Sequence, residues 1–222
     1  MDWFPLWLSL RVAALSTVFA GTIGIGLAYI LAKGRFRGRA LLEALATVPI
    51  VLPPTVLGYY LLVVLGVRTP IGRVWESVFG SPLVFTPAAA VVAATVSALP
   101  FVLRTSRAAL EAVEPRFEQA ARTMGLPEWR VALQVSLPLA RRGLIAGTAL
   151  GFARALGDFG VTVMLAGNIP GRTQTMPIAL YDAVQAGSDR TASNLSAVLA
   201  AIAIVVLVAV NRLSASSSQD RR

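Results

Sequence analysis

Long apolar stretches alternate with short polar segments along this chain of 222 residues. The apolar stretches cover approximately 6–32, 41–67, 86–103, 143–166 and 191–210. Each is close to the roughly 20 residues that a helix needs to cross a bilayer, and no run of barrel-like alternation accompanies them. Because an open sheet cannot satisfy its backbone in hydrocarbon, the pattern predicts an all-α integral membrane protein. We expect one domain over residues 1–222 with five spans, or at most six.

The polar segments differ in charge according to the side of the membrane on which they would lie. Segments 33–39, 104–142 and 212–222 carry +4, +3 and +2, whereas segments 1–5, 68–84 and 168–190 carry −1, +1 and 0. Basic residues accumulate on the cytoplasmic side of membrane proteins. The chain is therefore predicted to be a multi-pass protein of a bacterial or archaeal cell (inner) membrane, with an external N-terminus and a cytoplasmic C-terminus. The basic clusters are interpreted as orientation signals and not as a nucleic-acid surface.

Composition excludes several kinds of chemistry. The chain has no Cys and no His, so no thiolate nucleophile, imidazole metal site or Ser/His dyad can form. Its only lysine, Lys33, is followed by Gly34, so no phosphate-binding GxxxxGK[ST] loop exists. We therefore expect no catalytic, cofactor-binding or metal-binding residue in this chain. If its work is driven by ATP, a partner subunit must bind the ATP and Mg²⁺.

The second apolar stretch contains residues that oppose a continuous helix. Its middle reads PIVLPPTVLGYY, and the residues of interest are Pro49, Pro53, Pro54, Thr55 and Gly58. Each proline removes a backbone donor and collides with the preceding turn. Broken backbone at membrane depth is tolerated where it is covered by protein or lines a wet cavity, and in transporters it marks the substrate path. We predict a translocation path here; the alternative is a proline kink that serves packing.

The fourth apolar stretch, GTALGFARALGDFG, holds two patterns with a spacing of four residues. Gly147, Gly151 and Ala155 form a small-residue stripe that favours close helix contact. Arg154 and Asp158 share a helix face and are predicted to pair, because ionisable groups at this depth are costly when alone. A structural ion pair is the preferred interpretation, and direct contact with a substrate is the alternative.

The polar segment 104–142 predicts a short amphipathic helix between two spans. Pro115 suits the first helical position, Glu118 and Arg122 can support each other across one turn, and Gly125 ends the helix. A second short helix would follow from Pro127 and end at Pro138. The apolar stripe of the first helix is Phe117, Ala120, Ala121 and Met124. The second helix would carry Trp129, Leu133 and Ser136 on one face. Small central residues favour docking of a partner over burial in the membrane surface.

This segment resembles the EAA loop of ABC-importer permeases, which couples the membrane subunit to an ATPase. The resemblance assigns the coupling helix to Glu118, Gln119, Ala120, Ala121, Gly125, Leu137 and Pro138. One departure stands out: counting back from Gly125, Gln119 occupies the usual acidic position, and Glu118 lies one residue earlier.

Two further stretches, PIVLPPTVLGYYLL (49–62) and GDFGVTVMLAGNIPGRTQTMPIALYDAVQAG (157–187), resemble molybdate ABC-transporter permeases. The resemblance implies a type I importer bundle and a subunit that moves an oxyanion, most simply molybdate, without enzymatic activity of its own. The implied partners are a second copy of the chain, two ATP-binding cassette subunits, an external (periplasmic) oxyanion-binding protein and membrane lipid. Alternatives are a sulfate, thiosulfate or tungstate permease and, from other classes, an autonomous channel or a membrane hydrolase.

Overall fold

A computed structural model describes residues 3–34 and 36–215. Arg35, Arg221 and Arg222, which contribute to the charge pattern, lie outside the described residues. In chain order the elements are α1 (Phe4–Lys33), α2 (Arg39–Val51), α3 (Pro54–Leu65), α4 (Pro70–Phe79), α5 (Pro87–Glu111), α6 (Pro115–Thr123), α7 (Glu128–Val131), the π-helical turn η1 (Ala132–Ser136), α8 (Leu137–Leu156), α9 (Gly160–Ala166), α10 (Met176–Gln185) and α11 (Asp189–Ala215). All regular structure in the described residues is helical.

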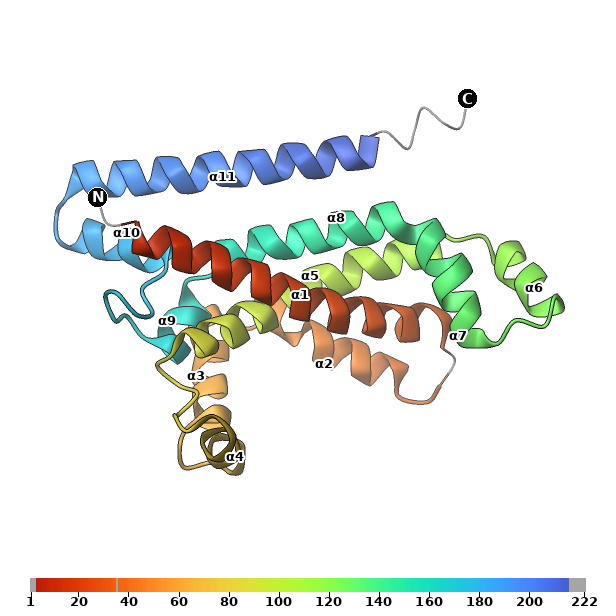
Figure 1. Cartoon of the computed structure of the whole chain (residues 1–222), viewed down its shortest axis with the longest axis horizontal. Coiled ribbons are helices and arrows are strands. Elements are labelled where there is room, and N and C mark those ends of the chain that lie inside the picture. Colours follow the sequence, from red (N-terminus) through yellow and green to blue (C-terminus); the bar gives the residue numbers. More distant parts are fainter. Residues whose placement is uncertain (1–2, 35, 216–222) are drawn as a thin grey trace.

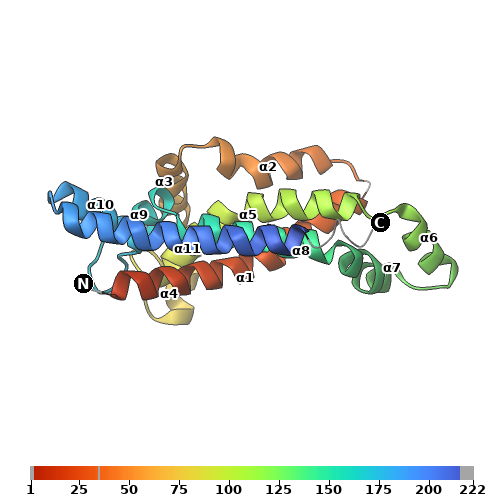
Figure 2. The same ribbon diagram turned by 90° about the horizontal axis from the view of Figure 1, so that it is seen from above.

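Five elements, α1, α2, α5, α8 and α11, lie lengthwise in an elongated bundle (Figures 1 and 2). The chain runs along α1, back along α2, forward along α5, back along α8 and forward along α11. The α1–α2 link, α6, α7 and the end of α11 therefore gather at one end of the bundle, while the N-terminus and α10 lie at the other. The three basic segments of the sequence thus lead to the same end.

The centre of the bundle is the contact among α1, α5 and α8, the most extensive packing in the fold. Helix α5 presents a row of buried alanines, among them Ala90, Ala94 and Ala98. A Cβ atom at Gly24 of α1 would lie 3.0 Å from Val102 Cγ1, and one at Gly151 of α8 would lie 2.5 Å from Val102 Cγ2. Small residues therefore allow the three backbones to approach closely, as the small-residue pattern of α8 predicts.

The lengths and hydropathy of the helices are consistent with five spans. Three helices are long and apolar enough to cross a bilayer: Phe4–Lys33, Pro87–Glu111 and Asp189–Val206. Two bent pairs, α2 with α3 and the helix Glu128–Leu156 with α9, qualify when each pair is counted as one crossing. By length and composition the described residues thus contain up to five spans.

The third span ends later than expected. Helix α5 continues to Glu111 instead of stopping at residue 103. Residues 104–111, RTSRAALE, include good helix formers, and Arg107 Nε pairs with Glu111 Oε1 at 2.8 Å, one turn apart. The first part of the polar segment is therefore an extension of a span. The break comes only before Pro115, where Glu114 has extended backbone.

The fourth span also differs from the prediction of residues 143–166. Elements α7, η1 and α8 follow one another without interruption from Glu128 to Leu156, and the span breaks before α9 with a bend of 61°. Pro138 was expected to end a short helix, but it lies in the first turn of α8. The preceding turn is π-helical, with Leu137 N donating to Ala132 O. We attribute the continuity to this wider turn, which gives room for the proline ring.

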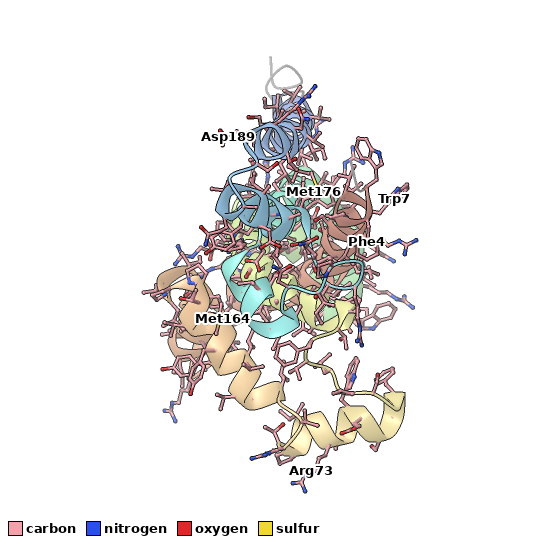
Figure 3. All side chains as sticks on the ribbon, turned by 90° about the vertical axis from the view of Figure 1, so that its left-hand side faces the viewer. Phe4, Trp7, Arg73, Met164, Met176 and Asp189 are labelled. Atoms are coloured by element: carbon pink, nitrogen blue, oxygen red, sulfur yellow. The ribbon has the colours of Figure 1, made fainter. Side chains whose placement is uncertain are left out.

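Two short helices, α4 and α10, were not predicted from the hydrophobic pattern. Each follows a threonine and has a proline in its first turn. At α4 the Thr69 hydroxyl accepts a hydrogen bond from Gly72 N at 2.9 Å, which is an ordinary N-cap. Helix α4, marked by Arg73, stands away from the bundle (Figure 3), whereas α10 packs against α11 and α1.

Candidate functional site

The polar helix α6 has a sharply defined C-terminal end. Leu126 N donates to Ala121 O at 3.2 Å and Gly125 N donates to Arg122 O at 2.9 Å. This pair of bonds is a Schellman motif, which requires a left-handed residue at the position of Gly125. Gly125 has φ +80°. The glycine therefore ends the helix by backbone conformation, as the sequence predicts.

The inner face of α6 is fastened to the bundle by Glu118. Glu118 as a whole residue is only 4% exposed. Its Oε1 atom lies 2.8 Å from Lys33 Nζ at the end of α1 and accepts a hydrogen bond from Ser136 Oγ of η1 at 2.7 Å. Ala121, one turn later, is also buried. Glu118 is thus turned toward its own chain and away from the outer surface.

The outer face of α6 carries Gln119 and Ala120, both exposed. Phe117 and Met124 are also exposed, Met124 by 74%. The expected apolar stripe is therefore divided, because Ala121 faces inward while its other three members face outward. Gln119, at the position where an acidic residue is usual, belongs to the outward surface.

The predicted support of Glu118 by Arg122 is weak in the structure. Arg122 Nη2 lies 4.0 Å from Glu118 Oε2. Its guanidinium instead donates to Glu128 Oε1 at 2.7 Å and to Glu128 Oε2 at 3.1 Å, and this contact raises the pKa of Arg122 above its ordinary value. Arg122 therefore braces the turn between α6 and α7, since a bidentate pair has a favourable geometry that one oxygen at 4.0 Å lacks.

The π-helical turn changes which residues share a face after α6. Trp129 and Leu133 are 60% and 58% exposed, whereas Ser136 is buried. Their regular helical spacing predicted one common face, which is wrong because the π turn inserts an extra residue. Of the two remaining residues of the expected coupling set, Leu137 is half-buried and Pro138 is exposed.

The second span breaks where its prolines predict. Leu52 and Pro53 have extended backbone, Pro54 begins α3, and the axis turns by 117° between α2 and α3. Pro49 lies within α2 and is half-buried. At the break itself Pro53, Pro54 and Thr55 are exposed on the chain.

Gly58 has a different role from the exposed residues before it. A Cβ atom at Gly58 would lie 2.6 Å from Met164 Cβ of α9. Reciprocally, a Cβ atom at Gly160, the first residue of α9, would lie 2.7 Å from Pro54 Cβ. The segments that follow the breaks of the second and fourth spans are therefore packed directly against each other.

Arg154 and Asp158 form an ion pair at the break of the fourth span. Arg154 Nη1 lies 3.0 Å from Asp158 Oδ1, and Asp158 is almost fully buried. The other oxygen, Oδ2, accepts from Thr162 N at 3.0 Å and from Thr162 Oγ1 at 2.7 Å. Asp158 thus satisfies donors at the start of α9. This arrangement favours the structural interpretation of the pair over contact with a substrate.

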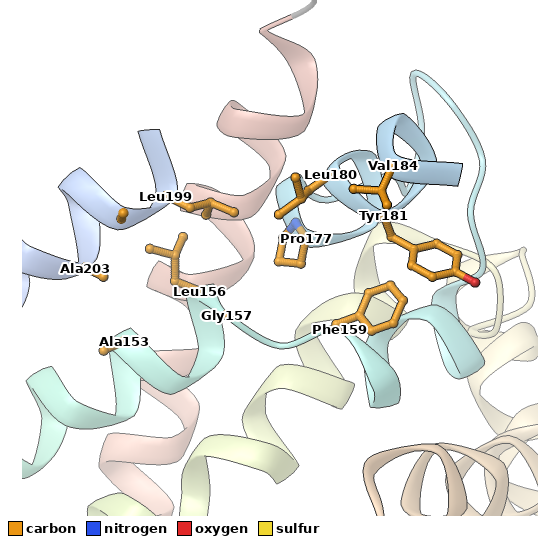
Figure 4. Close-up of a pocket in the computed structure, with 11 residues that line it drawn as sticks. Ala153, Leu156, Gly157, Phe159, Pro177, Leu180, Tyr181, Val184, Leu199 and Ala203 are labelled. Atoms are coloured by element: carbon orange, nitrogen blue, oxygen red, sulfur yellow. The ribbon is translucent and has the colours of Figure 1, made fainter. Parts of the chain in front are cut away.

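A cavity of about 590 Å³ opens beside this break, between α8, α10 and α11 (Figure 4). Leu156, Pro177, Leu180 and Leu199 line it, and the rings of Phe159 and Tyr181 meet at its edge with centroids 5.2 Å apart. This apolar lining offers no cation to a charged oxyanion. The cavity is therefore unsuited to bind one.

The opposite end of the bundle from α6 carries a loop, residues 167–175, fixed by side-chain amides. Asn168 Nδ2 donates to Asp182 Oδ1 and Oδ2 at 2.9 and 2.7 Å, and Gln174 Nε2 donates to Asp182 Oδ2 at 2.7 Å. Met176 N donates to Ser9 Oγ at 2.8 Å, which attaches α10 to α1. The stretch AGNIPGRTQT therefore forms a defined surface.

Sequence reasoning missed Lys33 and Ser136 as partners of Glu118. Lys33 ends the first apolar stretch and lies far from Glu118 in the sequence, so no local spacing connects them. It also missed the cluster in which Arg107 pairs with both Glu43 of α2 and Glu111. For the second pair a signal was present, because Arg107 and Glu111 are four residues apart.

Comparison with known proteins adds a family and relatives. Residues 22–221 match the family described as "Binding-protein-dependent transport system inner membrane component". The chain is 41% identical over 221 residues to the Molybdenum transport system permease protein ModB of Escherichia coli (strain K12), covering 99% of this chain and 96% of that protein. It is 40% identical over 185 residues to the protein of that name in Azotobacter vinelandii, covering 83% and 82%. The Sulfate transport system permease protein CysT of Escherichia coli (strain K12) is 34% identical over 205 residues, covering 92% and 74%.

Among solved structures, a chain of the inward-facing MetNI methionine ABC transporter has a similar fold. The TM-score is 0.74 at 20% sequence identity, covering 97% of each chain. An amino acid ABC transporter structure gives a TM-score of 0.61 at 16% identity, covering 91% of this chain and 87% of that one. At these identities the likeness concerns the fold alone, and it supports an importer-type helical bundle.

Proposed function

Because the chain belongs to the family of binding-protein-dependent transport system inner membrane components, we propose that it is the permease of an ATP-driven molybdate importer. The identity of 41% over 99% of the chain to a molybdenum transport permease carries this proposal. The sulfate permease is 34% identical over 92% of the chain, so sulfate is the cargo against which molybdate must be tested.

The permease provides a path and a coupling surface but no hydrolytic chemistry. Without a phosphate-binding loop, the chain depends on ATP-binding subunits for nucleotide and Mg²⁺. The family description also implies a binding protein that delivers the cargo. The finer assembly is a homodimer of this chain over two ATP-binding cassette subunits.

The coupling surface is the outward face of α6 and α7. Ala120 and Gly125, with the exposed Phe117 and Met124, form a surface of small and apolar residues around the helix end, and the uncharged polar Gln119 lies beside them. A partner groove can approach small residues closely and bury the apolar ones. This end of the bundle then faces the cytoplasm. The loop 167–175 and the start of α1, at the opposite end, face the binding protein.

The path runs past the paired breaks of the second and fourth spans. Pro53, Pro54 and Thr55 are exposed on the single chain, so a second copy can enclose them around a common pathway. The packing of α3 on α9 links the two breaks, which lets them move together. The ion pair of Arg154 with Asp158 stabilises the break between α8 and α9.

Competition in a reconstituted system tests the cargo. The permease, its ATPase and its binding protein are placed in proteoliposomes, and uptake of labelled molybdate is measured with tungstate or sulfate in excess. We expect tungstate, which shares the shape and charge of molybdate, to compete and sulfate to compete weakly. Uptake of labelled sulfate at the rate of molybdate, with the same binding protein, would assign the chain to sulfate transport instead.

A further inference from the structure

A buried polar contact joins α6 to a span that is remote from it in the sequence. Helix α6 is linked through the chain to α5 on one side and to α7 on the other, and it packs mainly against α7 and η1. Glu118 of α6 reaches α1, because its Oε1 lies 2.8 Å from Nζ of Lys33, the last residue of α1. The same oxygen receives the Ser136 hydroxyl from η1.

We propose that Glu118, Lys33 and Ser136 are positioning residues that transmit movement of α6 to α1 during the ATPase cycle. This inference rests on the proposed function. It adds a connection that the covalent chain does not supply, because α6 is otherwise continuous only with the segments leading to α5 and α8. Helix α1 packs on both α5 and α8, so movement delivered to its end reaches the centre of the bundle.

Burial distinguishes this contact from the ion pair between Glu114 and Arg116 at the start of α6. The Glu118 side chain is 6% exposed and that of Lys33 is 17% exposed, whereas the side chains of Glu114 and Arg116 are 58% and 73% exposed. A buried charge left without its partner is strongly unfavourable, but an exposed pair contributes little. Glu118 is therefore constrained to follow Lys33 and Ser136, while Glu114 is free to exchange its partner for water.

The π-helical turn is what brings Ser136 into the contact. Leu137 N bonds to Ala132 O, five residues back, and Ser136 faces inward although Leu133 faces outward. Such turns are rare and often mark functional positions. Because η1 leads directly into α8, the contact also includes this helix. The Oε1 atom of Glu118 thus receives one donor from the end of α1, Lys33, and one from the turn that precedes α8, Ser136.

Charge-removing variants test this connection in the complex with the ATPase and binding protein. Glu118→Gln and Lys33→Gln each break the pair. The control is Glu114→Gln, the same substitution at an exposed carboxylate, the N-cap residue of α6. The measurement is the amount of oxyanion taken up per ATP hydrolysed, together with copurification of the ATPase. We expect the first two variants to keep the ATPase bound but lower this ratio by roughly 2- to 30-fold, the range for residues that carry coupling. Glu114→Gln should leave it unchanged.

The exchanged pair Lys33→Glu with Glu118→Lys should recover most of the coupling, since it restores an ion pair at the same place. If Glu118→Gln does not reach the membrane, Lys33→Gln still breaks the contact, because Lys33 lies at the partly exposed end of α1. A wild-type uptake ratio in both single variants would overturn the proposal. A wild-type complex without ATP-driven uptake would instead refute the proposed function itself.

Discussion

At the level of single residues, Gly125 and Gly58 serve opposite purposes. Gly125 is needed for a backbone conformation, because its φ is +80° and a Cβ atom there would meet nothing within 4 Å. Gly58 is needed for space, because a Cβ atom there would lie 2.6 Å from Met164 Cβ. The two glycines therefore make distinct predictions.

Gly125→Val should weaken attachment of the ATPase while leaving insertion of the permease intact. A β-branched residue in the left-handed region costs about 1–2 kcal/mol, and relief of that strain opens the Schellman turn. Copurification of the ATPase with the permease measures the effect. Gly125→Asn is the matched control, because Asn tolerates this region, and it should retain attachment. If the Val variant copurifies with as much ATPase as the unchanged permease does, α6 is not the docking element.

Gly58→Ala should destabilise the permease itself. The added methyl forces α3 and α9 apart, and overpacking of this kind costs about 1–3 kcal/mol. A lower Tm of the detergent-solubilised protein is expected. Gly26→Ala, where nothing lies within 4 Å of the added atom, should keep or raise the Tm, because Ala is a better helix former than Gly. If both variants melt alike, α3 and α9 are not packed as described.

Local residue chemistry predicted part of the site well. The helix end at Gly125, the Arg154–Asp158 pair and the small-residue stripe of α8 follow from residue type and local spacing, because each is defined by residues within about two turns of one another. The Glu118–Lys33 contact could not be foreseen, since it joins segments brought together only by the packing of α1, α5 and α8. Local spacing pointed instead to Arg122, which the structure places against Glu128.

At the level of elements, the broken spans are the feature that separates this bundle from a simple one. The prolines of the second span predict its break, and the structure gives a turn of 117° between α2 and α3. The break of the fourth span was not predicted. Its signal is Gly157 followed by Asp158, the residue before the N-cap of α9, which accepts hydrogen bonds from Thr162 in the first turn. This signal lies within an apolar stretch, where the sequence alone indicates only the ion pair with Arg154.

Changing both Pro53 and Pro54 to Ala should impair transport more than assembly. The substitutions restore backbone donors and favour a straighter helix, which would displace the exposed residues proposed to line the path. Uptake should fall while the ATPase still copurifies. The single change Pro49→Ala, within α2, is a control that leaves the break in place. Normal uptake by the double variant would show that the break serves packing only.

Hydrophobic periodicity located the long helices but not where they end. Helix α5 continues beyond its apolar part, and the π turn carries α7 into α8 past Pro138. Hydropathy reports where a helix is surrounded by lipid, whereas its ends are set by capping and backbone geometry. For the same reason α4 and α10, which are short and begin at Thr-Pro signals, did not emerge from the pattern.

For the whole molecule, the charge pattern of the sequence predicts a testable orientation, and the described parts of the basic segments lead to one end of the bundle. A reporter fused after Arg222 should be active on the cytoplasmic side, and one inserted at Pro170, in the loop at the other end, on the external side. Basic residues set this orientation during insertion. An external reading from the C-terminal fusion would reverse the assignment of α6 to the cytoplasm.

The dependence of transport on the ATPase is the decisive property of the complete assembly. Molybdate uptake into proteoliposomes should be measured with the permease alone, with the ATPase added, and with both the ATPase and the binding protein in the presence of ATP. We expect uptake only in the complete system, because the chain has no phosphate-binding loop of its own and we propose that α6 docks the ATPase. Molybdate flux through the permease alone, unaffected by the ATPase or ATP, would instead identify an autonomous channel.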